Sequence, residues 1–148
     1  MSQPRLIICE KTGRWAVAFR RALADRGERI VEARSLAGCA RQLDRHPASF
    51  VAIEISAVNL DTVLAVVPDW LRRFPHCRVI ALLESDLAAA ESLLREAGVV
   101  AVVRTTREAP TVALRAQQHL DAAPADDLPL EQAILSSLPW ANWAARPA

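Results

Sequence analysis

The sequence has only four glycines in 148 residues, and no stretch of it resembles the glycine-rich loops that hold phosphate groups. Gly13 follows the first apolar run alone, without the further glycines or the lysine of either common phosphate-binding motif. A dinucleotide-binding fold is therefore not expected, even though apolar runs and helical patterns alternate along the chain.

Cysteine is also scarce, and its three positions, Cys9, Cys39 and Cys77, are far apart in the sequence. Metal ligands usually come in pairs at short spacings, and an odd number of cysteines does not form a complete set of disulfides. Cys9 and Cys39 lie beside apolar residues, and Cys77 lies just before the apolar run 79–83. We therefore expect buried, reduced thiols, and neither a metal ion nor a cofactor.

Long apolar runs and an excess of one charge are both missing. No apolar stretch approaches the roughly 18 to 20 residues that a membrane-spanning helix needs. The first residues lack the charged start and cleavage site of a secretory signal, so we expect a cytoplasmic protein. The net charge is +1, from 18 basic and 17 acidic residues, so neither a nucleic acid nor an anionic membrane is an expected partner.

Residue types that carry out catalysis are present, but the sequence does not arrange them for it. No serine lies in a nucleophile-elbow motif, and His46, His76 and His119 are far apart. Since no nucleophile, base and orienting group can be assembled, we expect a protein without catalytic residues, not an enzyme.

Between residues 5 and 122, five apolar runs alternate with five helical patterns. The runs cover residues 6–9, 29–33, 50–55, 79–83 and 99–103, and the helical patterns cover about 15–26, 36–45, 60–74, 87–97 and 109–122. Short links between such elements favour a parallel sheet covered by helices on both faces. Pro68 either kinks the third helix or lies in the first turn of a helix that begins late.

The last part of the chain has a different composition. We expect a domain over residues 1–123 and, over 124–148, a linker, a short amphipathic helix and a tail that contains tryptophan. Leu138, Trp140 and Trp143 lie close together near the end, and tryptophan is enriched at binding hot spots. This apolar segment either docks on a partner or folds back over its own domain.

The order of elements from Arg5 to about Ala122, with Gly98 before the last strand, resembles the receiver domain of two-component response regulators. The resemblance implies a flavodoxin-like, five-stranded parallel α/β fold. It also implies a pocket in which acidic residues after the first strand hold Mg²⁺ and an aspartate ending the third strand accepts a phosphoryl group. Here Glu10 and Lys11 follow the first strand, and Glu54 stands in the place of the aspartate.

The remaining pocket positions depart from the receiver pattern as well. Leu83 stands where receivers have a small hydroxyl residue, and Arg104 and Thr105 replace the Lys-Pro pair, with Arg104 as a candidate for the cationic role. The resemblance is therefore to a degenerate, pseudo-receiver type. We expect Glu54 to lie near Lys11 or Arg104, either as a simple salt bridge in place of the metal or as a lock on one signalling state.

An altered pocket of this kind predicts a phosphorylation-independent interaction module in a bacterial regulatory system, with a protein partner or a second copy of the chain. The alternative is an atypical response regulator that accepts a phosphoryl group with non-standard residues. Receivers commonly signal through their fourth helix, fifth strand and fifth helix, which correspond here to residues 87–96, 102–106 and 112–119.

Overall fold

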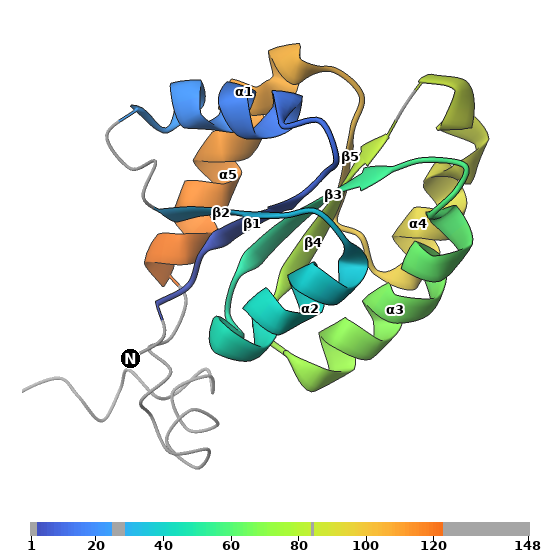
Figure 1. The fold of residues 1–148 in the computed structure, drawn as a ribbon, viewed down its shortest axis with the longest axis horizontal. Helices are drawn as coiled ribbons and strands as arrows, with labels where there is room; N and C mark the ends of the chain where they lie inside the picture. Colours follow the sequence, from blue (N-terminus) through green and yellow to red (C-terminus); the bar gives the residue numbers. More distant parts are fainter. Residues whose placement is uncertain (1–2, 25–28, 84, 123–148) are drawn as a thin grey trace, which may run out of the picture.

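The computed structural model describes residues 3–24, 29–83 and 85–122, in which strands and helices alternate (Figure 1). The strands are β1 (Leu6–Cys9), β2 (Ile30–Ala33), β3 (Phe50–Ile55), β4 (Arg78–Leu83) and β5 (Ala101–Val103). The helices are α1 (Arg14–Ala22), α2 (Leu36–Arg45), α3 (Leu60–Arg73), α4 (Glu91–Ala97) and α5 (Ala109–Ala122). Two short 3₁₀ segments, η2 (Ser85–Ala90) and η3 (Thr106–Glu108), precede α4 and α5.

The strands form one parallel sheet in the order β2-β1-β3-β4-β5. Helices α1 and α5 cover one face, and α2, α3 and α4 cover the other (Figure 1). This arrangement confirms the predicted flavodoxin-like α/β fold.

The apolar runs are continuous because the inner strands are buried on both faces. Leu6 and Ile8 of β1 pack toward α1 and α5, whereas Ile7 and Cys9 pack toward α2 and α3. In β3 only Glu54 is partly exposed, and it lies near the carboxyl end of the strand, where the loops meet.

Two helices differ from the sequence prediction. Helix α3 begins at Leu60 and contains Pro68 within it, so the late start considered for this helix is wrong. The single helix expected over 87–97 is divided into η2 and α4, and η2 itself is kinked at Leu87, which has the non-helical angles φ −103° and ψ 17°. Helix α4 ends as expected at Gly98, whose φ of 113° is in the left-handed region that favours glycine.

Residues 123–148, including the candidate partner-binding residues Leu138, Trp140 and Trp143, lie outside the described part of the chain. Among the helices that are described, none has the length and the apolar character needed to cross a membrane.

Candidate functional site

The carboxyl ends of β1 and β3 open into a cleft of about 570 Å³, whose walls come from the loops after β1, β2 and β3. These two strands are neighbours, but the chain leaves β1 toward β2 on one side and β3 lies on the other. Ligands of open α/β sheets bind at such a reversal of strand order. The cleft is therefore the candidate functional site.

Glu10 is directed into the protein at one side of this cleft and is only 4% exposed. Its Oε1 accepts a hydrogen bond from the backbone N–H of Trp15 at 3.0 Å, and its Oε2 accepts one from Ala16 at 2.6 Å. The residue before α1, Gly13, has no side chain to satisfy these N–H groups. Glu10 therefore caps α1, where a negative charge is favoured by the helix dipole.

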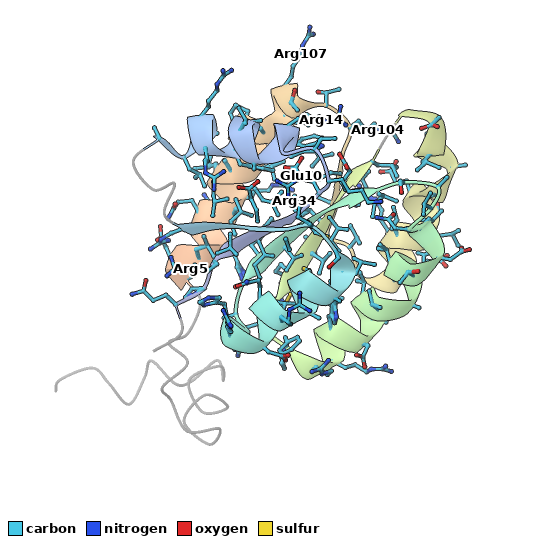
Figure 2. All side chains as sticks on the ribbon, in the orientation of Figure 1. Arg5, Glu10, Arg14, Arg34, Arg104 and Arg107 are labelled. Atoms are coloured by element: carbon cyan, nitrogen blue, oxygen red, sulfur yellow. The ribbon has the colours of Figure 1, made fainter. Side chains whose placement is uncertain are left out.

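Glu54 reaches the cleft from β3, with 15% of its side chain exposed, and its Oε2 lies 3.7 Å from Nε of Arg14. Its ion-pair partner is Arg14. Of the two expected neighbours, Lys11 lines the same cleft and Arg104 does not. Arg14 is the first residue of α1, so the turn after β1 brings its guanidinium to the end of β3 (Figure 2). Lys11 lines the cleft without an ion pair to any residue that the structure describes.

Arg104 does not take the cationic role in the cleft. Its Nη2 donates a hydrogen bond to Oε2 of Glu91 in α4 at 2.6 Å, and Glu91 also accepts one from Arg95 at 3.1 Å. These hydrogen bonds, that of Arg104 first, lower the pKa of Glu91. Since β2 and β5 are the two edges of the sheet, Arg34 after β2 and Arg104 after β5 lie on opposite sides of Glu10 (Figure 2).

Leu83 and Thr105 also lie away from the cleft. Leu83 is buried in the core between the sheet and α3, and it pairs in register with Ile55. Thr105 caps η3, and its backbone N–H donates to the carboxylate of Glu108 at 3.1 Å. The six predicted pocket residues therefore divide: Glu10, Lys11 and Glu54 line the cleft, and Leu83, Arg104 and Thr105 do not.

Three residues of this region were missed by sequence reasoning: Arg14, Arg34 and Asn59. Arg34 directly follows β2, and its Nη1 donates to the carbonyl of Lys11 at 2.8 Å. Asn59 closes the loop after β3, accepting from the N–H of Ser56 and donating to the carbonyl of Glu54, both at 2.8 Å. Residues that follow parallel strands lie at the same edge of the sheet. Since Arg34 follows the second predicted strand, this rule could have placed it beside Glu10 and Glu54.

The three cysteines are buried and free of disulfides, as predicted, although two of them meet in space. The thiol of Cys39 donates a hydrogen bond to Cys9, which lowers the pKa of Cys9 and raises that of Cys39. Burial raises the pKa of Cys77 to about 12. Cys9 borders the cleft, whereas Cys39 and Cys77 are fully enclosed.

The side chains of the cleft do not fit the Mg²⁺ that the receiver resemblance implies. Mg²⁺ needs several oxygen ligands in octahedral geometry. Both oxygens of Glu10 accept backbone hydrogen bonds, Lys11 brings a positive charge, and Glu54 faces Arg14. Across residues 3–24, 29–83 and 85–122, no three His, Cys, Asp or Glu side chains gather as metal ligands would.

No family model matches the sequence, and no curated protein matches it. Solved structures do resemble it. A response regulator from Thermotoga maritima has a TM-score of 0.64 and 16% identity, covering 81% of this chain and 99% of its own. A CheY-like protein, TadZ, from Pseudomonas aeruginosa PAO1 has a TM-score of 0.64 and 18% identity, covering 79% and 99%.

A third similar structure is HP1043, an orphan response regulator of H. pylori, with a TM-score of 0.56 and 16% identity, covering 79% of this chain and 96% of its own. At these identities the likeness concerns the fold, and it extends over nearly the whole of each of the three structures. The chain therefore has the fold of response-regulator receiver domains.

Proposed function

We propose that this chain is a phosphorylation-independent interaction module of a bacterial regulatory system, with a receiver-like domain over residues 1–123 and a binding tail over 124–148. The observation that carries the proposal is the position of Glu10. A carboxylate that accepts backbone N–H groups of α1 with both of its oxygens is turned toward the helix, and fewer of its lone pairs face the cleft for a metal. Phosphoryl transfer depends on that metal to spread the developing charge.

The position of Leu83 supports the same proposal. A receiver needs a hydroxyl at the end of its fourth strand to follow the phosphoryl group, and here an apolar side chain 1% exposed packs into the core. Because Leu83 has no hydroxyl, it cannot form the hydrogen bond by which a receiver transmits the phosphorylated state. A chain of this kind would signal by being present and by binding, and not by changing state.

The surface formed by α4, β5 and α5 is a candidate for the partner-binding face. Glu91 accepts hydrogen bonds from Arg95 in the same helix and from Arg104 after β5, so one hydrogen bond joins α4 to the end of β5. Leu93 of α4 is 49% exposed, and an apolar side chain so exposed offers contact area to a partner. We infer a face held in one arrangement, available to a protein partner or to a second copy of the chain.

The experiment that tests the proposal is incubation of the full chain with Mg²⁺ and acetyl phosphate, followed by intact-mass measurement. We expect no gain of a phosphoryl group. A Lys11→Asp/Glu54→Asp double variant restores two acidic residues of the receiver pattern and shows whether the cleft can be repaired. A phosphoryl adduct on the unaltered chain that is lost in Glu54→Gln would overturn the proposal in favour of an atypical phospho-accepting regulator.

The contribution of the tail is tested separately. We propose that Leu138, Trp140 and Trp143 form an apolar contact with a partner, because large aromatic side chains contribute most to hot spots. Light scattering on the full chain and on a Trp140→Ala/Trp143→Ala variant measures self-association. A dimer that becomes a monomer in the variant would assign the tail to self-assembly, and an unchanged mass would exclude that role and leave a different protein as the partner.

A further inference from the structure

The cleft at the ends of β1 and β3 presents positive charge in a place where a receiver presents negative charge. Lys11 and Arg34 line it, and neither forms an ion pair with an acid in the described part of the chain. The two acids of the cleft are already compensated. Glu10 accepts the N–H groups of α1, and Glu54 lies beside Arg14.

Arg34 is held in position by the protein itself. Its Nη1 donates to the carbonyl of Lys11 at 2.8 Å, which fixes the guanidinium beside the loop after β1 (Figure 2). A guanidinium has five N–H donors in a planar fork, so the others are free to bind the oxygens of an anion in parallel. The Arg34 side chain is therefore tied to the backbone of Lys11, and both residues line the same cleft.

The start of α2 adds to this positive field. Ser35 and Leu36 line the cleft, and the Ser35 hydroxyl caps the ten-residue helix by accepting from the N–H of Gly38 at 3.0 Å. The dipole of α2 places partial positive charge at the same wall as Arg34.

The cleft also has apolar surface, since Leu36 lines it and Val58, which is 86% exposed, lies at its edge. A ligand with an apolar body next to its charged group would cover both kinds of surface.

We propose that this cleft binds a small organic anion, through a phosphate or carboxylate group on Lys11 and Arg34, without a metal ion. The site lies on the α2 side of the sheet edge and does not include Leu83, Arg104 or Thr105. This proposal does not depend on the proposed function, because the cleft and the surface formed by α4, β5 and α5 are different parts of the domain.

The test is a backbone amide NMR titration of the full chain in EDTA, with phenyl phosphate, benzoate and inorganic phosphate as separate probes. We expect saturable shifts confined to Lys11, Thr12 and residues 35–37. Phenyl phosphate and benzoate distinguish the two head groups, and inorganic phosphate measures what the apolar body adds. Shifts spread over all the arginine-bearing surfaces, without saturation, would overturn the proposal.

Two matched variants locate the charge. Arg34→Gln should weaken the affinity for the best probe by about tenfold or more, the loss expected for a hydrogen bond to a charged group. Arg115→Gln removes the same charge from the outer surface of α5 and should leave the affinity unchanged. Equal losses in the two variants would show that only net charge matters and would contradict a site at Arg34.

Glu54→Gln distinguishes this site from a metal-dependent one. The substitution removes a repelling carboxylate and releases Arg14, so we expect the affinity for the anion to rise. A site that held phosphate through Mg²⁺ would require Mg²⁺ and would lose affinity in the same variant. The two explanations therefore predict changes of opposite sign.

Discussion

The Oε2 atom of Glu10 accepts the backbone N–H of Ala16 at 2.6 Å, and this carboxylate takes the place of an N-cap side chain for α1. Glu10→Ala leaves the N–H groups of Trp15 and Ala16 buried and unsatisfied. We expect the free energy of unfolding to fall by about 1–3 kcal/mol. Denaturant unfolding measures it, with Lys11→Ala as a control that should change it by less than about 0.5 kcal/mol. A neutral Glu10→Ala would contradict the capping role.

The ion pair between Arg14 and Glu54 should contribute little to stability, although it lies at the candidate site. The atoms Nε and Oε2 are 3.7 Å apart, and the side chain of Arg14 is 56% exposed. A double-mutant cycle with Arg14→Gln and Glu54→Gln should give a coupling energy of about 0.2–1 kcal/mol that shrinks with added salt. A coupling of several kcal/mol would show that this pair locks the domain.

His119 should make stability depend on pH. Its Nε2–H donates to the carbonyl of Ala48 at 2.9 Å. Burial lowers the pKa of His119 below its ordinary value of 6.5, against the opposite effect of this hydrogen bond. The unfolded chain then binds a proton that the folded chain rejects, so stability is retained above pH 6.5 and is lost as the pH falls through the lowered pKa.

Unfolding measured across this pH range in the unaltered chain, His119→Gln and His76→Gln tests the assignment. Glutamine keeps a donor for Ala48 and cannot titrate, so the free energy of unfolding of His119→Gln should depend less steeply on pH. His76 is exposed at the surface, and His76→Gln should keep most of this pH dependence. Identical slopes in the unaltered chain and His119→Gln would assign the effect to other groups.

The three thiols should react with iodoacetamide in a fixed order. Cys9 borders the cleft and has a lowered pKa, so it should be alkylated first in the folded protein. Cys77, whose pKa is raised to about 12, should react only when the chain unfolds. Peptide mass analysis gives the rates. Cys39→Ala removes the donor to Cys9 and should slow its alkylation, whereas Cys77→Ala should not.

The alternation of strands with helices and the two-sided core follow from periodicity, because runs such as Leu6–Cys9 are apolar at every position. Side-chain pairing at the sheet edge was not predictable in the same way. Glu54 pairs with Arg14, which directly follows Gly13 with its left-handed φ of 85°, and a turn geometry of this kind leaves no periodic signal. Arg104 pairs with Glu91, the first residue of α4. The pattern of apolar residues predicted one helix over this region, without the break between η2 and α4.

The meeting of Cys9 with Cys39 was hidden for a related reason. Both cysteines occupy apolar positions of their elements. Their spacing in the sequence does not show that Cys9 of β1 and Cys39 of α2 face each other in the core. Family resemblance placed Glu10 correctly at the end of β1, but it could not show that the carboxylate caps α1.

A magnesium titration followed by backbone amide NMR tests most directly whether this receiver fold has lost its metal site. The amides of Trp15 and Ala16 report on the Glu10 carboxylate, because they donate to it. We expect no saturable shift of either amide at millimolar Mg²⁺ and no change in their hydrogen bonds. Saturable shifts at both amides, abolished by Glu10→Gln, would show that the Glu10 carboxylate binds the metal and would contradict the phosphorylation-independent role.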